Sequence, residues 1–230
     1  MIFLTLESVP VSSQSLPGSA YGLPVVNSIS LFEKTCLHHP EKEMMALLPG
    51  NGLSLDLRYE TKNNFTHQVL YREKPRQTYL RKPAAMALDS VLSDLKRMNL
   101  GLKIFDAYRP YFITVKLWEK EPDPRYAADP AKGSGHNRGI SVDLTLIDLK
   151  TNRPLEMPTG FDNFTDSAHQ DFMSLSPRII GNRNLLKEVM EKHGFIALPT
   201  EWWHFSWPHP EDFDVLDLDF DELKRQVDKK

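Results

Sequence analysis

Residues 133–148 read GSGHNRGISVDLTLID and join a glycine-rich turn to an apolar segment. The second half of this stretch, GISVDLTLID (139–148), is rich in β-branched residues, which favours a strand. Asp143 stands inside that apolar run, and a buried carboxylate is costly unless it is paired or bound to a metal. His136 precedes it by seven residues, in the turn. Both side chains are candidate ligands of a divalent metal, but two ligands do not make a site.

A third candidate ligand occurs much later in the chain, in EWWHF (201–205). His204 adds a second imidazole, and two imidazoles with one carboxylate bind Zn²⁺ while leaving a fourth position for water in catalytic sites. A carboxylate that is not itself a ligand can accept the proton of such a water, and Glu201 is the candidate for this base. Any single histidine is more typical of a hydrogen-bonded core residue, so the hypothesis depends on the three ligands together.

The spacing of these residues places a condition on the backbone. Side chains of a strand alternate between its two faces, so residues separated by an odd number point apart. Glu201 and His204 therefore require a bend near residues 198–201, where a proline favours one. His136 and Asp143 have an odd separation too, and the glycines around His136 allow it to lie in a turn outside the strand.

Composition narrows the class of partner. The chain has 230 residues, with 28 basic residues against 31 acidic ones and a net charge of −3, so it offers no broad basic field for nucleic acid or anionic lipid. Its single cysteine, Cys36, excludes an internal disulfide and a cysteine-rich zinc site. No stretch approaches the roughly 18 apolar residues of a membrane span, and no basic residue precedes Lys34 as a secretory signal requires. We expect a cytoplasmic protein without a membrane partner, and a periplasmic location stays open.

The order of elements predicts an α+β fold. We expect an antiparallel-rich sheet with helices packed on one face. Apolar spacing predicts helices over 83–98, from 110 onward and over 182–194, and strands over 53–59, 102–108, 139–148 and 201–207. The expected domain organisation is an N-terminal arm covering the domain (1–50), a catalytic domain that carries the candidate zinc site (51–208) and an acidic C-terminal tail (209–230), the tail forming a solvated end or a docked strand.

Four motifs together resemble those of a known family. FDAYRP (105–110), SGHNRGISVDLTL (134–146), MPTGFDNF (157–164) and EWWHF (201–205) are similar, in this order, to motifs of the VanX-type D-alanyl-D-alanine dipeptidases. These are zinc peptidases of the wider D-Ala-D-Ala carboxypeptidase and hedgehog-like superfamily. The similarity runs from about residue 53 to residue 207, and it implies a fold of the hedgehog and DD-peptidase type.

The resemblance implies one Zn²⁺ per chain, held by His136, Asp143 and His204. It implies that Glu201 is the catalytic base and later the proton donor. The implied reaction is hydrolysis of the dipeptide D-alanyl-D-alanine, a small substrate with a free amino group and a free carboxylate.

The resemblance also implies roles around the metal. Arg109 matches the arginine that stabilises the charge developing on the attacked carbonyl, although an arginine at a strand end can equally be a structural ion-pair partner. Ser134 and Asp162 fall where the family places groups near the termini of the substrate. Asp106 is interpreted as a structural hydrogen-bonding group. Ser141 departs from the family, in which alanine is usual at this position, and this change concerns packing.

Two other functions remain open from the sequence. One is a related peptidoglycan DD-carboxypeptidase or endopeptidase, against which the expected lack of an export signal argues. The other is a non-catalytic zinc-stabilised binding domain, against which the presence of both Glu201 and Arg109 argues. The oligomeric state stays open.

Overall fold

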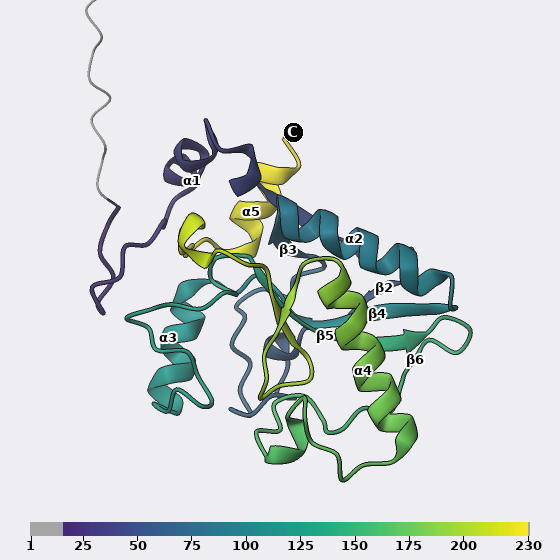
Figure 1. Cartoon of the computed structure of the whole chain (residues 1–230). Helices are drawn as coiled ribbons and strands as arrows, with labels where there is room; N and C mark the ends of the chain where they lie inside the picture. The colour runs from purple at the N-terminus through teal and green to yellow at the C-terminus, as the bar shows by residue number, and fades with distance from the viewer. Residues whose placement is uncertain (1–15, 230) are drawn as a thin grey trace, which may run out of the picture.

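The computed structural model describes residues 16–229, and its centre is a mixed sheet (Figure 1). The strands follow the order β2 (Leu53–Leu55), β4 (Leu100–Asp106), β5 (Ser141–Asp148), β8 (His204–Ser206) and β7 (Ile196–Ala197), and β6 (Arg153–Pro154) also pairs with β5. Only the β2–β4 pair is parallel among these described strands. The α+β class and the antiparallel-rich sheet predicted from the sequence are confirmed.

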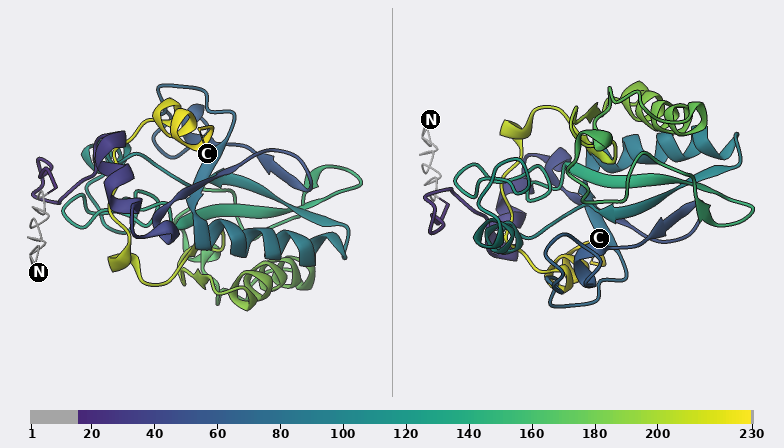
Figure 2. Two further views of the ribbon diagram at one scale, coloured as in Figure 1. Left: turned by 90° about the horizontal axis from the view of Figure 1, so that it is seen from above. Right: turned by 90° about the horizontal axis from the view of Figure 1, so that it is seen from below.

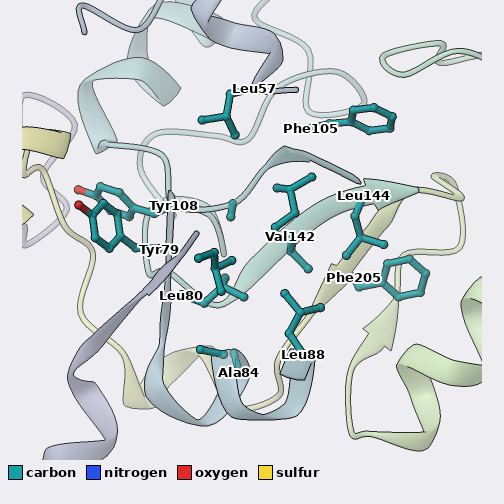
Figure 3. Close-up of a cluster of buried hydrophobic side chains, with 14 of the residues drawn as sticks. Leu57, Tyr79, Leu80, Ala84, Leu88, Phe105, Tyr108, Val142, Leu144 and Phe205 are labelled. Carbon is teal, nitrogen blue, oxygen red and sulfur yellow. The ribbon is translucent and has the colours of Figure 1, made fainter. Parts of the chain in front are cut away.

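β5 is the central strand of this sheet, and its residues are buried on both faces. It pairs with β4 along one edge, and with β8 and β6 along the other. Its residues are buried from Ser141 through Ile147, which explains the nearly continuous apolar run. Val142 and Leu144 point from β5 into the hydrophobic core toward Leu88 (Figure 3). Since side chains alternate along a strand, Asp143 lies on the opposite face.

Two long helices cover one face of the sheet. α2 (Lys82–Lys96) and α4 (Pro177–Lys192) lie side by side on this face in both views of Figure 2. α2 buries Leu88, Val91, Leu92 and Leu95 along one side. The helix predicted over 83–98 ends two residues early, at Lys96, and Met98 is 45% exposed.

The bounds of α4 differ from the prediction. The helix begins at Pro177, five residues before the predicted start at 182, because Ser176 caps it by accepting a hydrogen bond from the Ile179 N–H. Proline at the first position needs no hydrogen bond there, so the segment SPRII continues into the helix instead of a loop.

The other face of the sheet is covered by the loop 56–77 and by α5 (Phe220–Val227), drawn yellow in Figure 2. α5 starts with a capping box, in which Asp219 and Glu222 each accept a hydrogen bond from the other's backbone N–H. Phe220 and Leu223 are buried in the main core. The C-terminal segment therefore contains a docked helix, where the sequence had suggested a solvated end or a docked strand.

The described part of the expected N-terminal arm contributes to the core. It contains α1 (Ile29–Cys36) and β1 (Met44–Leu47), and β1 pairs antiparallel with β3 (Thr78–Arg81) in a second sheet. Val26 and Phe32 are fully buried. Neither β1 nor β3 was predicted from the sequence. Residues 1–15 of the expected arm lie outside the described residues.

The remaining elements are short. They are α3 (Tyr111–Lys120), which confirms the helix expected from 110 onward, and the 3-10 turns Pro40–Lys42, Arg58–Glu60, Asp166–Ala168 and Pro210–Asp212. The strand predicted over 53–59 ends at Leu55, and the one predicted over 201–207 spans only residues 204–206. Among the described helices, none is both long enough and apolar enough to cross a membrane.

Candidate metal centre

Strand register brings two of the candidate ligands together. Asp143 on β5 lies directly opposite His204 on β8, and opposite Asp106 on β4 on its other side. Directly opposed residues of antiparallel strands project from the same face of the sheet. A register shift between Ile104 and Asp106 in β4 puts Asp106 into this row. The Nδ1 atom of His204 lies 2.8 Å from Oδ1 of Asp143.

His136 reaches this row from a turn. It lies in the turn that precedes β5, and Gly139 closes that turn with a φ of +70°, which favours glycine. The Ser134 hydroxyl accepts a hydrogen bond from the His136 N–H at 3.2 Å. The Nε2 atom of His136 is 3.3 Å from Oδ2 of Asp143 and 3.2 Å from Nδ1 of His204. The turn that the glycines predicted is confirmed.

The donor set fits a divalent metal such as zinc. One ligand atom from each of His136, Asp143 and His204 lies within 4.8 Å of the other two. Nδ1 of His136 faces the carbonyl oxygen of Ala107 at 2.7 Å, and a carbonyl can only accept, so this nitrogen carries the proton. The lone pair of Nε2 therefore points toward the other two ligands. This arrangement, with the second ring nitrogen bound to a carbonyl, is typical of metal-ligating histidines.

The charges and hydrogen bonds around Asp143 favour its ionised form. Burial alone would raise the pKa of its carboxyl, but the neighbouring imidazoles of His136 and His204 hold it well below the usual range. A carboxylate that is already ionised can bind a cation without first losing a proton.

Glu201 lies in the turn between β7 and β8, outside the strand that carries His204. The Leu198 N–H donates to the His204 carbonyl at 3.0 Å, and residues 199 and 200 form a turn. The bend that the odd spacing required is confirmed. Glu201 lines the same cavity as the three candidate ligands. Burial raises the pKa of its carboxyl to about 7, so it can take up and release a proton near neutral pH.

Arg109 is both an ion-pair partner and a wall of the cavity. Its Nε and Nη2 atoms each lie 2.8 Å from Oδ2 of Asp106, and Nη2 is 4.0 Å from Oδ2 of Asp143. The guanidinium also lies over the Tyr59 ring, 4.8 Å from its centroid. Asp106 accepts a further hydrogen bond from the Tyr71 hydroxyl and is fully buried. The structure thus shows Arg109 as an ion-pair partner of Asp106 that also lines the cavity.

The sequence did not single out the tyrosines that support Arg109. Tyr59 and Tyr71 come from the loop 56–77 after β2. Tyr59 stood at the end of the strand predicted over 53–59, and Tyr71 had no predicted element. The interpretation of Asp106 as a structural hydrogen-bonding group agrees with its contacts, and its spacing of three residues from Arg109 was the available signal. No local pattern indicates the tyrosines, because they reach Asp106 and Arg109 only through the path of a long loop.

Ser134 and Asp162 both line the cavity. Asp162 occupies the left-handed region at φ +59°, and its Oδ2 accepts the Phe65 N–H at 3.1 Å. Loss of solvation on burial raises the pKa of the Asp162 carboxyl to about 8. All seven residues selected from the sequence thus surround one space.

That space is a cavity of about 310 Å³, at the small end of the range for ligand pockets. Besides the residues above, the loop before His136 lines it with Arg125 and Tyr126. The Tyr126 ring packs against Phe164 at 4.9 Å, so this loop and the 157–164 segment meet at the cavity. A cavity of this size accommodates a small molecule carrying charged groups.

The chain is similar in sequence to a family of known proteins. Residues 43–222 match the model of the M15 peptidase family, described as D-Ala-D-Ala dipeptidase. The chain is 37% identical to the D-alanyl-D-alanine dipeptidase of Escherichia coli strain K12 over 71% of this chain and 83% of that protein. It is 26% identical to the D-alanyl-D-alanine dipeptidase of Enterococcus faecalis over 71% of this chain and 91% of that protein. Among solved structures, the LdcB LD-carboxypeptidase matches 68% of this chain and 72% of its own, at 17% identity and a TM-score of 0.39.

Proposed function

Since this chain belongs to the D-Ala-D-Ala dipeptidase family of M15 peptidases, and is therefore a metallopeptidase, we propose that it hydrolyses D-alanyl-D-alanine to two molecules of D-alanine with one zinc ion. The observation that carries this proposal is the convergence of His136, Asp143 and His204 with Glu201 on one small cavity. Ligands and base come from separate turns and strands, and a purely structural site has no need of the base.

Zinc would be held by Nε2 of His136, a carboxylate oxygen of Asp143 and Nδ1 of His204. Bound zinc supplies Lewis-acid polarisation of the scissile carbonyl and acidifies the attacking water. Three protein ligands are the number typical of catalytic zinc sites.

Glu201 acts as the general base and then as the general acid. Its carboxylate accepts the proton of the attacking water, and its carboxyl then delivers this proton to the amine that leaves as the peptide bond breaks. The raised pKa suits both steps, because a group with a pKa near 7 exchanges its proton readily in either direction at neutral pH. Its position on a turn anchored by backbone hydrogen bonds keeps the carboxylate near the three ligands.

Arg109 stabilises the negative charge that develops on the carbonyl oxygen of the substrate. Its guanidinium is held by Asp106 and by the face of Tyr59, so the positive charge need not reorganise during the reaction. Because the charge on the oxygen appears only in the transition state, this interaction lowers the barrier selectively.

Asp162 and Ser134 select the two ends of a free dipeptide. The carboxylate of Asp162 suits the ammonium group of the substrate, whose positive charge would favour the ionised form of Asp162. The Ser134 hydroxyl can donate to the carboxylate at the other end while it accepts from the His136 N–H.

The test is an assay of zinc-loaded protein on three substrates: free D-Ala-D-Ala, its L,L isomer and a longer peptide ending in D-Ala-D-Ala. We expect the largest kcat/KM for the free D,D dipeptide, since both of its charged ends find a partner in the cavity. A larger kcat/KM for the longer peptide would favour a carboxypeptidase. Zinc binding without hydrolysis of any of the three would favour a binding domain.

A further inference from the structure

Two serines lie beside the candidate metal ligands on the same face of the sheet. Ser141 and Ser206 are directly opposed in the β5–β8 register, two residues from Asp143 and His204 along their strands. With the strand period of two residues, all four side chains project from one face. The serines are therefore the immediate neighbours of one side of the metal centre.

The serines are hydrogen-bonded to each other and to His204. Oγ of Ser206 lies 3.1 Å from Nε2 of His204 and 2.7 Å from Oγ of Ser141. Nδ1, the other ring nitrogen of His204, faces Asp143 and His136. The imidazole can present a lone pair at Nδ1 only if Nε2 carries the proton, and the Ser206 oxygen is its acceptor.

We propose that Ser206 and Ser141 are positioning residues that hold His204 in the tautomer and orientation needed for metal binding through Nδ1. This inference rests on the proposed function. Nε2–H of His204 donates to Ser206 Oγ, because Ser206 cannot donate to a nitrogen that already carries a proton. The Ser206 and Ser141 hydroxyls share a further hydrogen bond, in which either can be the donor.

Packing around Ser141 supports a polar role for its hydroxyl. Ser141 is fully buried, and a buried hydroxyl is costly unless it is hydrogen-bonded. A side chain at Gly135 would place its Cβ 2.0 Å from Ser141 Oγ, so the hydroxyl lies against the backbone of the turn that carries His136. Ser141 is thus accommodated by a glycine on one side and by Ser206 on the other.

The two histidines are held by different means. Nδ1 of His136 is bound to the carbonyl of Ala107, which no substitution removes, whereas Nε2 of His204 is bound to a side chain. His204 is therefore the ligand whose orientation a single substitution can loosen. Loss of such a partner typically weakens metal affinity by about 10- to 100-fold.

The test measures zinc affinity directly, by competition with a chromophoric chelator, in the full chain and its variants. We expect Ser206→Ala to bind zinc about 10- to 100-fold more weakly. Ser206→Thr keeps the hydroxyl and should stay near the affinity of the unsubstituted chain. Ser141→Ala leaves Ser206 in place, so its loss should be smaller than that of Ser206→Ala but measurable.

Ser54→Ala is the matched control. Ser54 lies on β2, outside the cavity, and its buried hydroxyl makes no hydrogen bond to any residue that the structure describes. This substitution removes a strand hydroxyl without touching His204, so zinc affinity should not change. The absorption bands of the cobalt-substituted protein provide a second readout, because a reoriented His204 changes them in Ser206→Ala while a general loss of stability does not.

Three outcomes would overturn the inference. If zinc affinity and the cobalt spectrum are unchanged in both Ser206→Ala and Ser141→Ala, the inference is overturned and the proposed function is not affected. The same holds if Ser54→Ala loses as much zinc affinity as Ser206→Ala. If Ser206→Ala does not fold, Ser141→Ala and Ser206→Thr carry the comparison. Failure of the unsubstituted chain to bind zinc at all would instead contradict the proposed function, and the inference with it, before any variant is compared.

Discussion

At the scale of single residues, the carboxyl groups of the cavity differ in pKa because their surroundings differ. Asp143 lies between two imidazoles, which hold its pKa well below the usual range, whereas burial raises the pKa of Glu201 to about 7. Groups whose surroundings push their pKa values apart are suited to different tasks. Asp143 is suited to bind a cation permanently, and Glu201 to exchange a proton during the reaction.

The first prediction separates base from ligand. Glu201→Gln keeps the shape of the side chain but cannot accept a proton, so it should retain zinc while turnover falls by at least about 100-fold. Zinc content and kcat are measured together, with Glu188→Gln on the exposed side of α4 as the control. Near-normal turnover would contradict the assignment of the base, and loss of zinc would make Glu201 a ligand instead.

The second prediction concerns pH and Asp162. Because burial raises the pKa of its carboxyl to about 8 in the folded chain, above its ordinary value of 3.8, ionisation opposes folding. The stability contributed by the protonated form is complete below about pH 4 and is lost as the pH rises toward 8. Asp162→Asn is neutral throughout, so the metal-free variant should melt a few degrees higher than the unsubstituted chain at pH 9.

The same variant should lose activity on the dipeptide, since Asp162 is proposed to bind the ammonium group of the substrate. Melting temperatures of the metal-free proteins at pH 5 and pH 9, and kcat/KM of the zinc-loaded proteins, check the two parts. A stability difference that is the same at both pH values would show that ionisation of Asp162 is not its cause.

At the scale of elements, the C-terminal helix supports the cavity from a distance. Phe220 of α5 packs edge-on against the Tyr71 ring at 4.9 Å and the Tyr108 ring at 5.9 Å. The Tyr71 hydroxyl donates to Asp106, which in turn holds Arg109. A contiguous set of contacts therefore joins α5 to the residue proposed to stabilise the transition state.

The third prediction tests whether α5 is part of the core. Phe220→Ala should lower the free energy of unfolding by about 3–5 kcal/mol, because it leaves a cavity among buried rings. Phe220→Leu fills most of that volume and should cost less. Denaturant titration of both variants gives the values, and a loss below about 1 kcal/mol in Phe220→Ala, the size of an ordinary substitution, would mean that α5 is not part of the core.

At the scale of the whole molecule, the proposed zinc site joins distant parts of the chain. His136 and His204 are 68 residues apart in sequence, and the ligands come from a turn, a central strand and a strand near the far edge of the sheet. A ligand that binds only the folded chain raises its stability by mass action. Zinc should therefore stabilise the fold as well as serve the reaction.

The fourth prediction is a melting shift on metal removal. When the free zinc concentration exceeds the Kd by 100-fold, zinc raises the free energy of unfolding by about 2.7 kcal/mol. A chelator should abolish this increase. Calorimetry with and without zinc measures the shift. His204→Ala should melt at the same temperature in both conditions, while His39→Ala, which changes an exposed histidine paired with Glu41, should keep the shift of the unsubstituted chain. A zinc-dependent shift that survives in His204→Ala would contradict the ligand assignment.

The sequence by itself determined the features that depend on local periodicity and on unusual residues. The sequence predicted the buried helix face from Leu88 to Leu95, the strand around Asp143 and the turn before it. These features are local, because the period of a helix or strand decides which side chains share a face. Asp143 stood out because a carboxylate inside an apolar segment is costly. His136, His204 and Glu201 stood out because with Asp143 they make the donor set and base of a catalytic zinc site.

Only the tertiary structure decided which of these elements meet. The register that opposes Asp143 to His204, the pairing of β1 with β3 and the docking of α5 depend on contacts between distant segments. The hydrogen bond between Ser141 and Ser206 has the same origin. Register is selected by the total burial of both strands and not by either strand alone, so no local pattern contains it.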